Sequence, residues 1–147
     1  MSDTPDTPND VVSIFDLVET DTSAEENGRW FKNVFGAESG VDLKMRAYGS
    51  RESQKVRRRL ERGYKGHIRN GELPDDISEK FLIEHLAEAV LLDWRGVFDK
   101  DKQPILYSKA AAVTLLTRIT AFRQVVLIGS QQIDGFRFEE REEGVKN

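Results

Sequence analysis

The sequence predicts an α+β fold that is mainly α, with an N-terminal β-hairpin or small sheet followed by about four helices. Residues 41–48 alternate strictly between apolar and polar side chains, which is typical of a half-buried strand. Beyond residue 50, apolar residues recur at spacings of three and four, which indicates amphipathic helices. The chain has 147 residues, enough for one domain with its own core, and no apolar run approaches the roughly 20 residues of a membrane-spanning helix.

Composition divides the chain into two charged ends and one domain. Residues 1–10 are polar and acidic and are expected to be disordered, and residues 139–147 are expected to form a frayed, charged tail. Residues 11–138 are expected to form a single α+β domain, with a β-containing part at 11–49 and a helical part at 50–138. The apolar segment 11–18 is too short for periodicity to distinguish a strand from helical turns. The polar N-terminus lacks the pattern of a signal peptide, so we expect a cytoplasmic protein.

Residues 28–48 predict a β-hairpin. Its first strand, Arg29–Phe35, is rich in aromatic residues, and the link to the second strand begins at Gly36 and ends at Gly40, as a turn would. A two-stranded hairpin is marginal alone, so its apolar face is expected to pack on helices or on another sheet edge. That face consists of Val41, Leu43, Met45 and Ala47.

Two helices are predicted in the middle of the chain. Ser50 is a good N-cap for a helix over residues 51–64, whose narrow apolar stripe leaves most of its surface basic. The next helix begins at Pro74, with two acids in its first turn. It is expected to end in a loop that begins at Trp94. The stripe of the first helix is Val56, Leu60 and Tyr64, and the apolar face of the second is Phe81, Leu82, Leu86, Ala89, Val90 and Leu92.

Two further helices complete the prediction. Ser108 is expected to cap a helix over residues 109–119, and Thr120 to cap a last helix from Ala121 to about Phe136. The inward residues of the first are expected to be Ala110, Val113, Leu115 and Leu116. Those of the second are expected to be Phe122, Val125, Val126, Ile128, Gly129 and Ile133.

Charge is distributed unevenly along a chain whose net charge is −4. Residues 1–27 contain eight acids and no Lys or Arg, whereas residues 51–69 contain eight bases and two acids. The basic helix could be a solvated face, pair with the acidic N-terminal segment, or contact an acidic partner or nucleic acid. Nucleic acid is the less favoured partner, because the protein is acidic overall and the consecutive Arg57, Arg58 and Arg59 point around the helix. The candidate partner-binding residues here are Arg57, Arg58 and Arg62.

Enzymatic motifs are absent from the sequence, so we expect a non-enzymatic protein with no cofactor and no metal. There is no cysteine, no G-x-S-x-G, no P-loop and no G-x-G-x-x-G, and His67 and His85 lack metal-ligand spacing and are expected to be structural or surface residues. Asp99-Lys100-Asp101 resembles the start of a calcium loop. Gln103 and Pro104 then break that pattern, and a β-turn is expected instead.

The connection 91–108 contains three aromatic residues, Trp94, Phe98 and Tyr107. Loops are usually polar, so these rings either fill the base of the core or contact a partner. All three are candidate partner-binding residues. Phe98 lies beside a turn that must be solvated and is the better exposed anchor, whereas Trp94 is the better core residue.

The segment Trp94-Arg95-Gly96-Val97, followed by Asp99-x-Asp101, Pro104 and the helix cap Ser108, resembles the central signature of tail assembly chaperones of long-tailed bacteriophages. The resemblance covers about residues 81–138. One departure is that Lys102 or Gln103 stands where the family often has glycine.

This resemblance implies a β-containing N-terminal part, a helical C-terminal part and a non-enzymatic factor in the cytoplasm of the bacterial host, made from a phage or prophage. Such factors bind the tape-measure protein, help to recruit tail-tube subunits and are typically absent from the finished particle. A homo-oligomer is possible. Two alternatives stay open: a small nucleic-acid-binding regulator that uses the basic helix 51–69, and a structural tail component retained in the virion.

Overall fold

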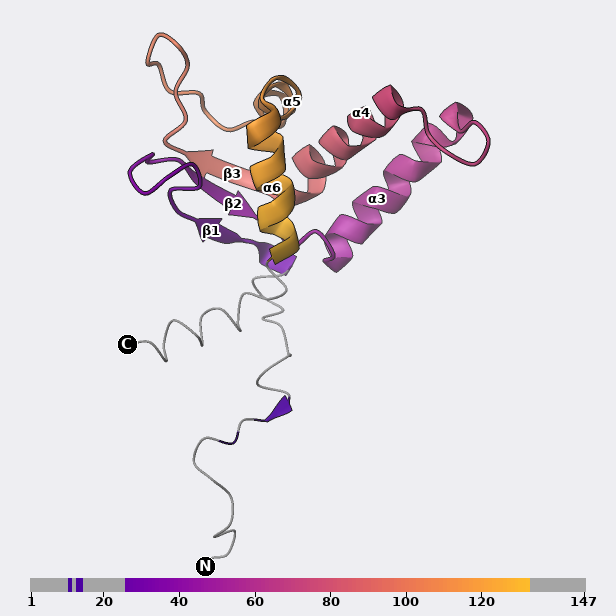
Figure 1. The fold of residues 1–147 in the computed structure, drawn as a ribbon, viewed down its shortest axis with the longest axis horizontal. Helices are drawn as coiled ribbons and strands as arrows, with labels where there is room; N and C mark the ends of the chain where they lie inside the picture. Colours follow the sequence, from indigo (N-terminus) through magenta and orange to yellow (C-terminus); the bar gives the residue numbers. More distant parts are fainter. Residues whose placement is uncertain (1–10, 12, 15–25, 133–147) are drawn as a thin grey trace, which may run out of the picture.

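The computed structural model describes residues 11, 13, 14 and 26–132 (Figure 1). The expectations for residues 1–10, for most of the apolar segment 11–18, for Ile133, for the last helix beyond Gln132 and for the tail 139–147 lie outside the described residues. Within them, a small antiparallel sheet is packed against helices, so the α+β fold is confirmed.

The sheet has the strand order β1-β2-β3, with β2 in the centre. The strands are β1 (Arg29–Phe31), β2 (Asp42–Met45) and β3 (Leu91–Arg95), and Leu43 of β2 lies opposite Phe31 on one side and Trp94 on the other. Leu43, Met45 and Ala47 are buried, which confirms the alternating pattern. The predicted hairpin is therefore present, with strands shorter than predicted.

The helices α3 (Arg51–Tyr64) and α4 (Asp75–His85) form an antiparallel pair that projects from the sheet (Figure 1). Ser50 caps α3 as predicted, because its Oγ accepts a hydrogen bond from the backbone N–H of Ser53 at 3.1 Å. A short 3-10 turn, η1 (Lys65–His67), follows α3. The far end of the pair is fastened by Tyr64, whose hydroxyl donates to Glu84 Oε1 at 2.8 Å and whose ring packs edge-on against Phe81.

The prediction that the second helix continues to Leu92 and ends in a Trp94 loop is wrong. After His85 the chain makes one wide π-helical turn, η2 (Leu86–Val90), and then becomes strand β3, which contains Trp94. The residues from Leu86 to Leu91, apart from Glu88, are almost completely buried. A segment buried on all sides has no amphipathic period, so the local pattern could not distinguish helix from strand. Pairing with β2, far away in the sequence, selects the strand.

Helices α5 (Lys109–Arg118) and α6 (Thr120–Gln132) complete the core, and in Figure 1 α6 crosses the sheet. Ser108 caps α5 as predicted, because its Oγ accepts from the N–H of Ala111 at 3.0 Å. Two inward predictions are wrong: Ala110 is exposed, with Ala112 buried in its place, and Ile128 is 52% exposed. Each helix buries a single row of residues spaced by four, two in α5 and three in α6, so a small error in the assumed face changes which residues point inward.

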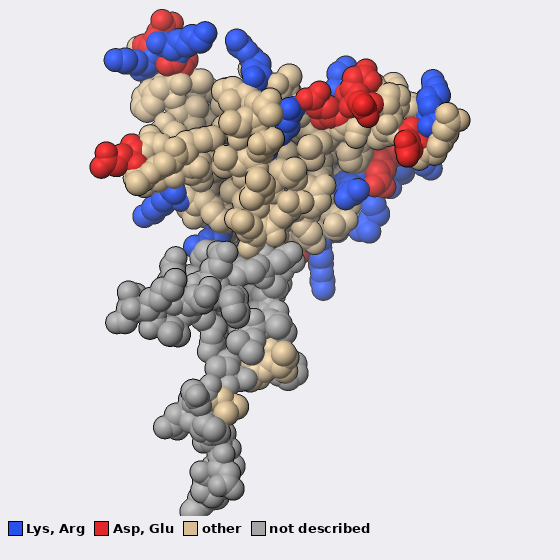
Figure 2. Space-filling model, viewed as in Figure 1, with Lys and Arg blue, Asp and Glu red and all other residues tan. Residues whose placement is uncertain are grey.

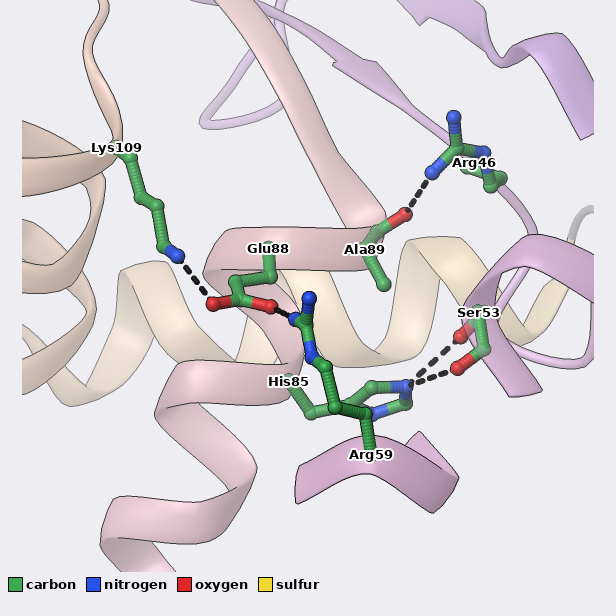
Figure 3. Close-up of polar contacts among 7 residues, drawn as sticks. All are labelled: Arg46, Ser53, Arg59, His85, Glu88, Ala89 and Lys109. Carbon is green, nitrogen blue, oxygen red and sulfur yellow. Dashed lines mark hydrogen bonds and ion pairs between the residues drawn. The ribbon is translucent and has the colours of Figure 1, made fainter. Parts of the chain in front are cut away.

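The turn η2 is the junction of the fold, since it contacts α3, α4, α5, α6 and β3. Its Glu88 forms ion pairs with Arg59 of α3 and Lys109 of α5, and the carbonyl of Ala89 accepts from Arg46 at 2.8 Å (Figure 3). Each helix of the described residues, taken alone, is too short or too polar to span a membrane. The pair α5 and α6 together would meet that length and composition, with a bend of 112° between them.

Candidate partner-binding surface

Trp94 and Tyr107 pack their rings against the core at the two ends of the segment 95–106, and do not present them to solvent. Trp94 is only 5% exposed, and its Nε1 donates to the carbonyl of Ile105 at 2.7 Å. The Tyr107 hydroxyl donates to the carbonyl of Leu91 at 2.8 Å, and the two rings pack edge to face with centroids 5.0 Å apart. Burial raises the pKa of Tyr107, and the nearby Asp93 carboxylate raises it further. Both predicted site residues therefore position the segment between them.

That segment forms a tight ribbon with a charged tip. The N–H of Ile105 donates to the carbonyl of Val97 at 2.8 Å, and the N–H of Lys102 donates to the carbonyl of Asp99 at 3.0 Å. The Asp99 carboxylate accepts from the N–H groups of Asp101 and Gln103, both at 2.9 Å, so it stabilises the turn. The expected β-turn is confirmed. The tip projects from the fold, and its charged side chains stand apart at the upper left of Figure 2.

Phe98 lies just before this tip and is 60% exposed. It borders a shallow depression of about 190 Å³, which we call the apolar groove. Phe35 and Ile119 are also exposed at the groove, by 42% and 46%. The lining residues are Phe35, Val41, Gly96, Val97, Phe98, Ile105, Leu115, Ile119 and Phe122. Every one is apolar or glycine, so no charged side chain lines the groove and its side chains suit an apolar ligand.

Gly96 allows the two sides of the groove to meet. Its φ is +77°, and a Cβ at this position would lie 1.9 Å from the carbonyl oxygen of Gly40. The turn 36–40 of the first hairpin therefore presses directly on the start of the 97–105 ribbon. A second depression of about 520 Å³ shares Gly96, Val97, Phe98 and Ile105 with the groove and is also lined by Leu106, which is 81% exposed.

Sequence reasoning missed Phe35 and Ile119 as groove residues. Phe35 follows a short strand and Ile119 follows a helix, and both are far from Phe98 in the sequence. Only the stacking of Phe35 on Phe122, with centroids 5.9 Å apart, and the folding of α5 onto the sheet bring them together. No local signal in the sequence predicts that proximity.

The three predicted arginines lie on α3, away from the apolar groove, so the structure divides the candidate residues between two surfaces. Arg57 forms an ion pair with Glu61 one turn along the same helix, at 3.2 Å. Arg58 and Arg62 are exposed and have no acidic partner among the described residues. The unpredicted Arg59 binds Glu88 (Figure 3).

The two histidines have structural or surface positions, as predicted. His67 is exposed on η1, and its ring lies 5.8 Å from that of Tyr64. His85 is 1% exposed, and its Nε2 lies 2.9 Å from Ser53 Oγ and 3.1 Å from the Ser53 carbonyl oxygen (Figure 3). Burial lowers the pKa of His85, and the Arg57 charge lowers it further, against the opposing effect of the Ser53 hydrogen bond. Among residues 26–132, no group of three His, Asp or Glu side chains is placed to hold a metal ion.

Of three comparisons with known proteins, the comparison with protein-family models gives a match. A family model described as YdaY prophage protein matches residues 48–147. No curated protein and no solved structure matches the chain.

Proposed function

The chain belongs to the family of YdaY prophage proteins, and from this premise we propose that it is a non-enzymatic tail assembly chaperone whose apolar groove binds the tape-measure protein of the same prophage. In this proposal it acts in the cytoplasm of the bacterial host and helps to recruit tail-tube subunits. The supporting observation from the structure is Phe98, a large aromatic side chain left 60% exposed at the edge of a groove that has no charged lining residue.

The family match supports the phage context of this proposal. Residues 48–147 include the whole segment 94–108 that resembles tail assembly chaperones. The resemblance and the family match therefore rest on the same part of the chain. They agree on origin from a phage or prophage, and the resemblance alone supplies the chaperone role.

The groove is suited to an amphipathic helix. A tape-measure protein is a long helical chain, and its apolar stripes would self-associate if left uncovered. A small domain can cover such a stripe when apolar side chains of the helix enter a groove. In binding of this kind, aromatic residues in water-excluding pockets contribute most of the affinity. Phe98 and Phe35 are the exposed aromatic residues of the groove, and the exposed Ile119 adds an aliphatic contact.

The Ser53–His85 contact supports a structural role and not a catalytic one. Ser53 is completely buried and His85 is 1% exposed, so a substrate carbonyl could not reach the serine oxygen. A Ser–His pair also needs a third group that orients the imidazole. The His85 Nδ1 has no hydrogen-bond partner among the described residues.

Co-expression with the tape-measure protein tests this proposal. We expect the tape-measure protein to stay soluble and to co-purify with this chain. If the two proteins fail to co-purify and solubility is unchanged, the proposal is wrong. A structural tail component would bind in the same way but would remain in the virion, and mass spectrometry of purified particles distinguishes the two roles.

A further inference from the structure

Helix α3 and its C-cap residue Lys65 carry a row of five basic side chains on the side opposite the packed face of α3. The row follows steps of four and three residues, which keeps it on one side of a helix with 3.6 residues per turn. The packed face consists of the buried Ser53 and the half-buried Val56, Leu60 and Tyr64. All five basic residues are exposed: Arg51, Lys55, Arg58, Arg62 and Lys65. We call this row the basic ridge.

The side chains of the basic ridge form no ion pairs with the described acids. Of the two acids on α3, Glu61 is paired with Arg57, which lies off the ridge, and Glu52 also lies to one side. In Figure 2, Lys and Arg are visible over α3 at the right, with Asp and Glu among them. Arg59 lies outside the ridge and is the residue that Glu88 binds.

The acidic net charge of the chain does not describe its folded part. Residues 28–132 contain 19 Lys and Arg and 13 Asp and Glu, a net charge of +6. The acids that reverse the sign lie in residues 1–27, with eight, and in residues 133–147, with five acids and three bases. The overall acidity of the chain is therefore no argument against a polyanionic ligand of α3.

We infer that the basic ridge binds the phosphate backbone of double-stranded nucleic acid without reading its sequence. Since α3 has 14 residues, the ridge spans about 21 Å, a length over which one strand presents about six phosphates. Arg51, Arg58 and Arg62 have the planar donor geometry that suits phosphate oxygens. This inference is independent of the proposed chaperone role and concerns a different surface.

The composition of the ridge favours phosphates over an acidic protein. A protein interface normally has an apolar or aromatic centre surrounded by charges. The ridge consists of Lys and Arg only, and the apolar residues of α3 face the opposite way. Phosphate contacts need no apolar centre, and their affinity comes mainly from release of counterions.

Glu26, at the described end of the acidic segment 1–27, contacts the start of the ridge. The Glu26 carboxylate accepts hydrogen bonds from the N–H groups of Arg51 and Glu52, at 2.8 and 3.3 Å. Seven more acids precede Glu26 in the sequence. As a tethered polyanion, this segment is a competitor that a binding experiment must address.

The experiment is fluorescence anisotropy of a labelled duplex of random sequence, titrated with the full chain at several salt concentrations. We expect micromolar binding at about 50 mM salt and a slope of log affinity against log salt of about −4.5, for five contacts. The double variant R58E/R62E is expected to bind at least about tenfold more weakly. The variant R58Q/R62Q removes the same two charges without reversing them. The thermal unfolding midpoint of each variant shows whether it is folded.

The matched control is K100E/K102E, which makes the same charge change on the exposed ribbon tip and should bind within about twofold of the unmodified chain. If the ridge variant and the tip variant lose equal affinity for the duplex, the inference is overturned. Displacement of the duplex by poly-glutamate at equal charge concentration would overturn it as well, because it would indicate a general anion surface. Absence of binding by both the unmodified chain and a variant with its first seven acids changed to amides would also overturn it.

Discussion

Phe98 and Trp94 lie in the same short segment and have opposite environments. Trp94 is buried because it lies in β3, paired with β2. Phe98 is exposed because it precedes a turn whose four charged residues must be solvated. This division was predictable from the sequence because a local cause, the neighbouring turn, determines the exposure of Phe98. The groove beside Phe98 was not predictable, because its other exposed residues come from a different hairpin and the end of a helix.

Gly96 is the residue whose substitution should damage the groove most. Gly96→Ala would place a Cβ against the backbone of Gly40 in a conformation that disfavours side chains. We expect the free energy of unfolding to fall by about 2 kcal/mol or more. Gly63→Ala is the control, since a Cβ there meets no atom within 4 Å. It should stabilise the chain by up to about 1 kcal/mol, because alanine favours a helix interior. Urea denaturation measures both changes, and a tolerated Gly96→Ala would contradict the close approach.

His85 should make the protein less stable in mild acid. Its pKa is lowered in the folded state, so the unfolded chain binds the proton more readily. The free energy of unfolding is therefore expected to fall as the pH drops from about 7.5 to about 5.5, through the unfolded histidine pKa. His85→Gln should flatten this dependence, whereas His67→Gln, which retains His85, should keep it. Urea titrations at several pH values measure this dependence. If the free energy of unfolding changes equally with pH in the unmodified chain and in His85→Gln, His85 is not the cause.

At the scale of elements, the parts of the fold that the sequence predicted well have a local cause. Capping serines and alternating residues determine the start of α3, the start of α5 and the inward face of β2. Strand β3 could not be predicted, because the buried run before it has no period and its partner strand is distant in the sequence. The resulting error also placed Trp94 in a loop instead of in the sheet.

The caps themselves can be tested at the start of α5. Ser108→Ala removes the acceptor for the Ala111 N–H and should lower the free energy of unfolding by about 1 kcal/mol. Thr114→Ala, at an exposed position inside the same helix, removes only a bond to the Ala110 carbonyl and should change stability by less than about 0.5 kcal/mol. Thermal denaturation of the two variants compares them directly. A larger effect for Thr114→Ala would argue against the capping role.

At the scale of the whole molecule, two chemically different surfaces lie on separate elements. The apolar groove joins the 97–105 ribbon to α5, α6 and the first hairpin, and the basic ridge lies on the projecting α3 (Figure 1). Neither surface contains a residue of the other. Variants of one surface are therefore expected to leave the binding activity of the other intact, because distant sites usually act independently.

Phe98 gives the most direct test of the proposed binding of the tape-measure protein by the apolar groove. The measurement is the amount of tape-measure protein that co-purifies with Phe98→Ser and with Leu106→Ser. Both residues are exposed apolar side chains of the same segment, but Leu106 lies outside the groove. Neither change should alter stability by more than about 0.5 kcal/mol.

We predict that Phe98→Ser reduces the recovered complex about tenfold or more, as expected for an aromatic anchor, while Leu106→Ser leaves it unchanged. Full recovery of the complex with a folded Phe98→Ser variant would contradict the claim.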